Sequence, residues 1–270
     1  DVIGLFMRHG EPATAVCAAD DKPAALPIVS QLAHKQGCCT ASDAADARRV
    51  ADRLSIPFYA IDFQEEFGRI MDYFVAEYTS GRTPNPCVMC NNWLKFGKLC
   101  EYADGIGADF VATGHYARLL RGDDPAAIPQ LVRGVDDSKD QTYVLFGIER
   151  EVLRRVLFPV GDFQKEEIRD MARDIGLRVA DKKDSQEICF VPDNDYGGFL
   201  RSANLVQKHR GEIVDMRGEV IGHHDGIEFY TIGQRKGLGI SSSQPLYVIE
   251  LDAENNRVVV QGAALIAQIR

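Results

Sequence analysis

The sequence of 270 residues contains no long apolar run and no leader segment. No stretch approaches the roughly 18 apolar residues that span a membrane, and no basic-then-apolar leader precedes the first apolar run, Val2–Met7. These two absences argue against a membrane-embedded or secreted protein. The chain begins with Asp1 and not with Met, so we expect that its N-terminal segment is missing, together with any targeting signal.

The sequence also has fewer positive than negative side chains, with 31 Lys and Arg residues against 40 Asp and Glu residues and a net charge of −9. Indiscriminate binding to nucleic acid requires a positive face, so we expect no DNA partner, whereas a local basic patch is compatible with RNA. The seven cysteines are odd in number, and a chain of this length folds without cross-links. Both points predict reduced thiols and a cytoplasmic protein.

The first two thirds of the sequence alternate strand-like apolar runs with helical patterns. The order is strand, helix, strand, helix, helix, strand, at residues 2–7, 42–54, 58–63, 65–78, 92–103 and 109–113. A further helix is predicted over Gln164–Ile175, followed by Gly176. This order is typical of an α/β fold with a parallel sheet and helices on both faces.

From Gly211 onward, short alternating runs are separated by glycine turns, as in GEIVDMRGEVIGHHDG. This pattern predicts a small antiparallel β module. We therefore expect a first domain over residues 1–204, a small β domain over residues 205–262, and the start of a further domain over residues 263–270.

Two cysteines stand three residues apart in TPNPCVMC, at Cys87 and Cys90. Such a pair can form a redox couple, half of a metal site, or two unrelated thiols. A redox couple usually opens a helix directly after a strand, whereas this pair follows a proline turn. A structural zinc site needs two further ligands, and the sequence has no second Cys-x-x-Cys and no paired histidine motif. A third cysteine, Cys189, lies between a polar run, typical of a site edge, and a predicted short apolar strand, where an ordinary buried thiol is the alternative.

Seven ordered blocks of this sequence resemble the tRNA-specific 2-thiouridylases, which place sulfur on the wobble uridine of certain tRNAs. The blocks include GRTPNPCVMCN, ADFVATGHYAR, GVDDSKDQTYVLFGI and RVADKKDSQEICFV, and together they cover nearly the whole chain. The resemblance implies a Rossmann-like adenine-nucleotide α-hydrolase domain of the PP-loop ATPase type, a small central β domain, and a C-terminal β-barrel that the chain only begins.

The resemblance also implies the chemistry of a sulfur-transferring enzyme. ATP, with Mg²⁺, adenylates the C2 oxygen of the uracil, so that AMP becomes the leaving group. Cys189 carries the sulfur as a persulfide, received from a sulfur-relay donor protein or a cysteine desulfurase. Cys90 is the nucleophile that attacks this persulfide, which leaves a Cys90–Cys189 disulfide.

Further positions match binding residues of the family. Met7 and Gly114 match ATP contacts, and a glycine after a strand lets a nucleotide approach closely. The other matches are to contacts with the tRNA anticodon loop, whose unpaired wobble base is easily splayed out. They are Asn85, Pro86, Cys87, His115, Lys139, Asp140 and Gln141. A turn glycine and a structural histidine are the alternatives at residues 114 and 115.

The sequence departs from the family pattern in the phosphate-binding loop. No run of the Ser-Gly-Gly-Val-Asp-Ser-Ser type occurs in it. We expect that this loop lies upstream of Val2 in the complete protein, and that the chain is inactive without it. A noncatalytic tRNA-binding fragment is the alternative from another class. Four cysteines match no role in the family, namely Cys17, Cys38, Cys39 and Cys100.

Cys87 stands where many relatives have aspartate, and this difference opens a second mechanism. With Cys90 and Cys189 it supplies three thiolates, which leave one corner of a [4Fe-4S] cluster open to bind and deliver hydrosulfide. The sequence leaves the cluster and the persulfide relay open. Amidating and ligating enzymes of the same fold also adenylate an oxygen, but they have no need of Cys90 and Cys189.

Overall fold

The computed structural model describes residues 1–8, 41–124, 126–182, 184, 188–191, 195–202 and 209–262. The chain divides into two compact units, of which the first consists of residues 1–68 and 87–190 and the second of residues 69–86 and 191–270. The boundary expected between residues 204 and 205 falls outside the described residues and stays a prediction. Residues 263–270 and three of the cysteines, at positions 17, 38 and 39, also lie outside them.

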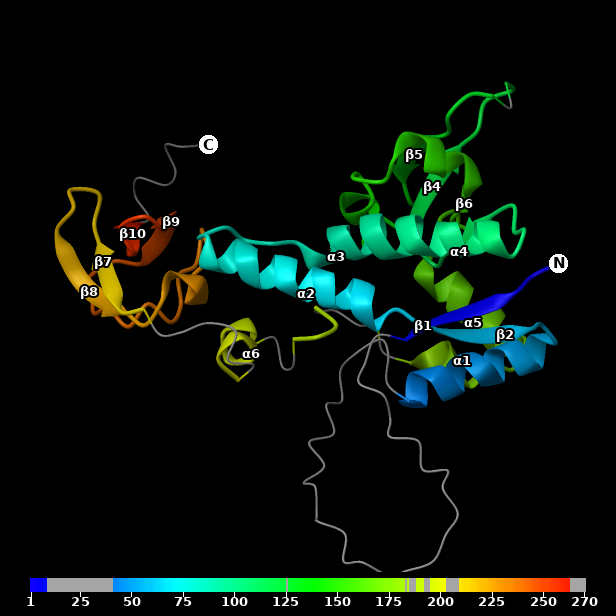
Figure 1. Ribbon diagram of the computed structural model, residues 1–270, viewed down its shortest axis with the longest axis horizontal. Helices are drawn as coiled ribbons and strands as arrows, with labels where there is room; N and C mark the ends of the chain where they lie inside the picture. The colour runs from blue at the N-terminus through cyan, green and yellow to red at the C-terminus, as the bar shows by residue number, and fades with distance from the viewer. Residues whose placement is uncertain are drawn as a thin grey trace, which may run out of the picture. The chain divides into compact units, whose positions relative to one another are not determined.

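The first unit begins with a strand, a helix and a second strand. β1, Gly4–Arg8, pairs in parallel with β2, Phe58–Asp62. α1, Ala41–Leu54, contacts both strands (Figure 1). Ser55 follows the helix with a φ of 55°, a left-handed conformation that ends the helical run before β2. These three elements confirm the predicted ones, with bounds shifted by one or two residues.

A second parallel pair joins β3, Val111–Ala112, to β6, Val156–Leu157. Between these strands lie an antiparallel hairpin and two 3₁₀ helices, at β4 Ala117–Leu120, β5 Gln130–Arg133, η2 Thr142–Val144 and η3 Arg150–Arg155. Their apolar side chains share one core with the helix that follows the proline turn. This core consists of Val88, Phe96, Ala117, Val144, Leu145, Ile148, Leu153, Val156 and Phe158. The two parallel pairs agree with the predicted α/β class.

The helix α5, Lys165–Asp174, begins and ends at strong local signals. The side chains of Gln164 and Glu167 form a capping box with the backbone N–H groups of its first turn. Gly176 follows the last turn with a φ of 76°, which glycine adopts without strain. The predicted helix is thus confirmed to within one residue at each end, and the 3₁₀ helix η4, Arg178–Asp181, comes next.

The helix predicted over residues 92–103 begins earlier and is wider in its middle. α3, Pro86–Met89, runs into a π-helix, η1 Cys90–Lys98, and then into α4, Leu99–Gly105. Pro86 suits the first turn, because the backbone N–H that proline lacks has no partner there. π-helical hydrogen bonds join residues five apart, and such stretches occur frequently at functional sites. The periodicity of the sequence does not distinguish this geometry from an ordinary α-helix.

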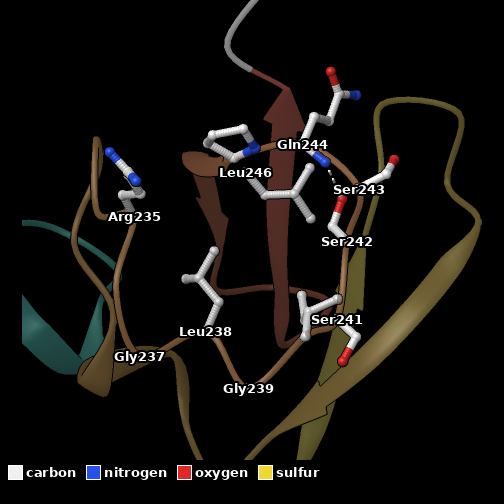
Figure 2. A pocket seen from close by; sticks show the side chains of 11 residues that line it. Arg235, Gly237, Leu238, Gly239, Ser241, Ser242, Ser243, Gln244 and Leu246 are labelled. Carbon is white, nitrogen blue, oxygen red and sulfur yellow. Dashed lines mark hydrogen bonds between the residues drawn. The ribbon is translucent and has the colours of Figure 1, made fainter.

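The second unit contains a four-stranded sheet in the order β8-β7-β10-β9 (Figure 1). The strands are β7 Gly211–Val214, β8 Val220–His224, β9 Leu246–Asp252 and β10 Arg257–Gly262. β7 with β8 and β9 with β10 are antiparallel hairpins, but β10 pairs with β7 in parallel. The prediction of an antiparallel module was wrong at this pair, because residues 225–245, which include η6 Ile227–Phe229, carry the chain across the sheet. Figure 2 shows part of this connection, from Arg235 onward, together with Leu246, the first residue of β9.

Two helices of the second unit are joined by aromatic contacts. α2, Gln64–Thr79, contributes its residues from 69 onward, and α6 comprises Tyr196–Ser202. The rings of Tyr78 and Tyr196 are stacked with their centroids 4.8 Å apart, and Phe74 meets Phe199 edge-on. Burial raises the pKa of Tyr78 to about 12, so its phenol stays protonated. No helix in the described part of the chain combines the length and apolar character that a membrane span needs.

Candidate functional site

Cys87 and Cys90 lie one turn apart at the start of the helix formed by α3 and η1. Cys87 is exposed and Cys90 is partly exposed. Val88, which lies between them in the sequence, is buried in the core of the first unit. One face of the helix start is therefore anchored in the core while both thiols stay accessible to solvent.

Asn91 anchors the same helix, and the sequence analysis missed it. Its side chain is 2% exposed, and its Nδ2 donates to the carbonyl oxygen of Val144 at 3.0 Å. Leu94 and Phe96, one turn further on, are also buried. The helix predicted from the sequence begins at residue 92, so Asn91 lay just outside it. The thiol of Cys90 thus belongs to a helix fixed by both apolar packing and a buried hydrogen bond.

Cys189 lies in the first unit as well and is partly exposed. The next residue, Phe190, packs edge-on against Phe67 of α2, with ring centroids 5.5 Å apart. Phe67 is itself buried, so this contact fixes the chain directly beside the thiol. The strand predicted here was wrong, since residues 189 and 190 form a turn. Pro192 follows closely in the sequence and lacks the N–H group that a strand ladder uses.

The three thiols of the cluster hypothesis do not form a metal-binding group. Among the residues that the structure describes, no three His, Cys, Asp or Glu side chains lie close enough together to hold a metal ion. Cys87, Cys90 and Cys189 are all described, so they form no site for a single ion, whereas the ligands of a [4Fe-4S] cluster bind separate irons, and the cluster stays a prediction. No described group can be assigned to Mg²⁺ either.

The two positions predicted to contact ATP lie near the ends of two parallel strands. Met7 lies in β1 opposite Ile61 of β2 and is partly exposed. Gly114 follows β3 by two residues, and a Cβ atom placed on it would meet no atom of the described residues within 4 Å. The fold around it therefore does not require glycine. Open space beside an exposed backbone is what close approach of a nucleotide would need.

His115 is a buried neutral imidazole. It is 6% exposed, its Nδ1 shares a hydrogen bond with Thr113 Oγ1 at 2.7 Å, and its ring packs against Phe96 and Phe158. Burial, with a smaller effect of nearby Lys95, lowers the pKa of His115 to about 3. The predicted contact of His115 with tRNA stays a prediction, and the described partners of its side chain are internal.

Asp140 and Gln141 hold the backbone of neighbouring segments. Asp140 accepts hydrogen bonds from the Gly134 N–H at 3.1 Å and from the Thr142 hydroxyl at 2.7 Å. Gln141 joins Tyr116 twice, because its Oε1 accepts from the Tyr116 N–H and its own N–H donates to the Tyr116 carbonyl, both at 3.0 Å. These bonds tie the block of residues 139–141 to the residues after Gly114. The two predicted groups of binding residues therefore form one connected region.

Lys139 connects this region to the segment that leads to Cys189. Its Nζ lies 3.0 Å from Oδ2 of Asp184. The hydrogen bond to this carboxylate raises the pKa of Lys139, so the ammonium group is charged at neutral pH. Asn85 and Pro86, by contrast, belong to the second unit, where the backbone of Asn85 hydrogen-bonds to the phenol of Tyr73.

Comparisons with protein families cover most of the chain. Residues 25–193 match the tRNA methyl transferase HUP domain, and residues 199–262 match the tRNA methyl transferase PRC-barrel domain. Together with the parallel strand pairs and the four-stranded sheet, these matches define a Rossmann-like nucleotide-binding protein with an appended β module. The fold class predicted from the sequence is confirmed.

Individual relatives narrow this assignment. The chain is 51% identical to the tRNA-specific 2-thiouridylase MnmA of Rhodopirellula baltica, over 96% of the chain and 68% of that relative. Proteins of the same name from Solibacter usitatus and Geobacter metallireducens are 51% and 54% identical, over 97% and 83% of the chain. The chain belongs to the tRNA-specific 2-thiouridylase family. It spans 72% and 60% of the length of these last two relatives, respectively.

Proposed function

We propose that this protein uses ATP to transfer sulfur to C2 of the wobble uridine of tRNA. One observation carries the proposal: two partly exposed thiols, Cys90 and Cys189, lie in one compact unit of a 2-thiouridylase family member. A ligase of the same fold would need neither thiol. The distance of 99 positions between them in the sequence makes their presence in one unit informative.

The first step activates the base. Oxide is a poor leaving group, so the C2 oxygen of the uracil attacks the α-phosphorus of ATP, pyrophosphate leaves, and the base becomes an adenylate. We assign the adenine nucleotide to the region beside Met7 and Gly114, where the backbone after β3 is open. Mg²⁺ would neutralise the phosphate oxygens during this transfer.

The second step delivers sulfur from Cys189, which receives it as a persulfide from a sulfur-relay donor protein or a cysteine desulfurase. The Cys90 thiolate attacks Sγ of Cys189, the S–S bond of the persulfide breaks, and hydrosulfide leaves. Hydrosulfide then attacks C2 of the adenylated base and expels AMP. The two electrons that reduce the sulfur come from the two thiols, so a Cys90–Cys189 disulfide forms, and an external thiol must reduce it before the next cycle.

The tRNA is proposed to bind through its anticodon loop. Asn85 and Cys87 are exposed directly before Cys90 in the sequence, where a flipped uracil can be read by polar edge contacts. Lys139 supplies a charged ammonium group for the backbone phosphates. Pro86, His115, Asp140 and Gln141 would act by holding these groups in place, since their described contacts are internal or buried.

A comparison of Cys90→Ser and Cys189→Ser in the complete protein tests this function. We expect both variants to release pyrophosphate when tRNA and ATP are present, because adenylation uses neither thiol, and to lose 2-thiouridine formation by at least about a thousandfold. Cys100→Ser is the matched control, because Cys100 is buried and burial raises the pKa of its thiol. Binding of tRNA by the wild type without release of AMP would contradict the proposal and favour a noncatalytic tRNA-binding protein.

The Cys87→Ala variant distinguishes the iron–sulfur alternative from the persulfide relay. In the persulfide relay this variant keeps the sulfur transfer step from persulfide-loaded Cys189, and loses at most affinity for tRNA. Both proteins are then reconstituted anaerobically with iron and sulfide. If the wild type binds about four irons, and Cys87→Ala loses both the iron and thiolation, the relay is wrong and a cluster is favoured.

A further inference from the structure

Three cations of the first unit converge on the carboxylate of Asp184. Its Oδ2 lies 3.0 Å from Nζ of Lys139, and its Oδ1 lies 3.0 Å from Nζ of Lys165 and 3.6 Å from Nη2 of Arg169. The Asp184 side chain is 27% exposed. The hydrogen bond from Lys139 is the main cause that holds its pKa below the usual range, so Asp184 is charged at neutral pH.

The partners of Asp184 are themselves held by other contacts. The backbone N–H of Lys165 donates to Oδ2 of Asp136 at 3.0 Å, and its Nζ lies 5.3 Å from the centre of the Tyr116 ring. The backbone N–H of Lys139 donates to the carbonyl oxygen of Asp136 at 3.0 Å. Asp184 therefore binds to a preformed frame built from α5 and from the residues beside the predicted ATP and tRNA contacts.

Asp184 lies five residues before Cys189 in the sequence. Five residues span at most about 18 Å when fully extended, so fixing Asp184 limits the positions that the Cys189 thiol can reach. On the other side of the thiol, Phe190 is fixed against Phe67. The sulfur-carrying residue thus lies between a polar anchor and an aromatic anchor.

We propose that Asp184 is a positioning residue for sulfur transfer, which holds Cys189 within reach of Cys90 through its ion pairs with Lys139, Lys165 and Arg169. This inference rests on the proposed function of the two thiols. Its consequence is that loss of the charge on Asp184 slows the attack of Cys90 on the persulfide but leaves adenylation intact, because adenylation does not involve Cys189.

Asp184→Asn in the complete protein tests the proposal, and Asp181→Asn is its matched control. Asp181 lies three residues upstream, is 74% exposed, and pairs with one arginine of α5, Arg173. With persulfide-loaded protein and saturating tRNA, we expect Asp184→Asn to lower the single-turnover rate of thiolation at least about tenfold. We expect the KM for tRNA and the rate of pyrophosphate release, which reports adenylation, to change less than about threefold.

Two further measurements separate positioning from a loss of folding. Asp184→Glu restores the charge and should recover a large part of the rate, and Lys165→Gln, which removes one partner, should lower the rate in the same direction. Alkylation of Cys189 by iodoacetamide, followed peptide by peptide in the absence of tRNA and ATP, should become at least about threefold faster in Asp184→Asn. Alkylation of Cys87 in the same sample should not change.

An active wild type in which Asp184→Asn and Asp181→Asn have equal rates and equal Cys189 alkylation would overturn the positioning role. The positioning role is also wrong if the melting temperature of Asp184→Asn falls and the rate per folded molecule does not. An inactive wild type would instead contradict the proposed function, so the two failures are distinguishable.

Discussion

Cys90 and Cys189 are held by different kinds of interaction, although both belong to the first unit. The helix of Cys90 is fixed by buried side chains and by the Asn91 amide, which are shielded from solvent. The described contacts of the segment of Cys189 include the partly exposed carboxylate of Asp184 and the edge-on contact of Phe190, and the buried Val191 follows. Apolar burial gives a rigid helix, whereas solvent-accessible ion pairs give an anchor that salt and charge changes can weaken.

This comparison suits a thiol relay. A sulfur-carrying cysteine must accept sulfur from a donor and then meet a partner thiol. Its segment therefore has to be positioned but must still be able to move. The attacking thiol has one partner and one direction of attack, and a fixed helix serves it best. Variants on the two sides should therefore differ in what they damage.

The largest effect is expected for Leu94→Ala, on the helix of Cys90. Leu94 is fully buried, and truncation of a buried leucine costs about 2–5 kcal/mol of the free energy of unfolding. Urea unfolding measures this loss. Leu120→Ala, which truncates a half-exposed leucine on β4, is the control and should cost less than about 1 kcal/mol. Equal losses in the two variants would mean that the Cys90 helix is not anchored by its apolar face.

His115 should make the same core sensitive to acid. In the unfolded chain its imidazole takes up a proton as the pH falls through 6.5, whereas in the folded protein it stays neutral down to about 3. Its contribution to stability is complete above pH 6.5 and is lost as the pH falls toward 3, by at most about 1.4 kcal/mol per pH unit. Urea unfolding at several pH values should show this slope in the wild type and a smaller one in His115→Asn. A wild-type slope no steeper than that of the variant would show that His115 titrates normally.

A smaller loss is expected for Asn91→Ala. The substitution leaves the buried carbonyl of Val144 without its donor, which costs about 1–3 kcal/mol. The adjacent Asn92→Ala offers a matched control, because among the described residues Oδ1 is buried and unpaired in both asparagines, and it is Nδ2 of Asn91 that donates to Val144. Thermal unfolding of both variants checks the difference. If Asn92→Ala proved the more damaging of the two, the assigned role of Asn91 would be wrong.

The smallest effect is expected from salt. Ion pairs that are about a quarter exposed are partly screened, so raising the ionic strength from about 0.05 to about 0.5 M should speed alkylation of Cys189 about twofold. Alkylation of Cys90 in the same sample should stay constant, because apolar packing holds its helix. A parallel increase at both cysteines would remove the distinction between the two anchors.

The elements with a strong local signal could be predicted from the sequence. The β1-α1-β2 unit and α5 follow from apolar periodicity, and α5 has a capping box at one end and Gly176 at the other. The parallel pairing of β7 with β10 could not be predicted, because strand patterns do not encode which strands become neighbours. The π-helical geometry that begins at Cys90 could not be predicted either, since α-helices and π-helices share their apolar positions over short runs.

The candidate site could be predicted only in part. The resemblance to the 2-thiouridylases pointed to Cys90 and Cys189, and the roles of both stay predictions until they are measured. Asn91 was not identified, and Asp184 was noted only as part of the polar run before Cys189, because their roles depend on partners far away in the sequence. Asp184 meets Lys139 across 45 positions, and Asn91 meets Val144 across 53, and such contacts have no local pattern.

The most direct test of the thiol relay is non-reducing peptide mass spectrometry after one turnover. Persulfide-loaded protein is mixed with ATP, Mg²⁺ and tRNA without added thiol, and the linked peptides are counted against the 2-thiouridine formed. We predict one Cys90–Cys189 disulfide for each 2-thiouridine. Formation of 2-thiouridine with both cysteines still reduced would contradict the relay between these two thiols.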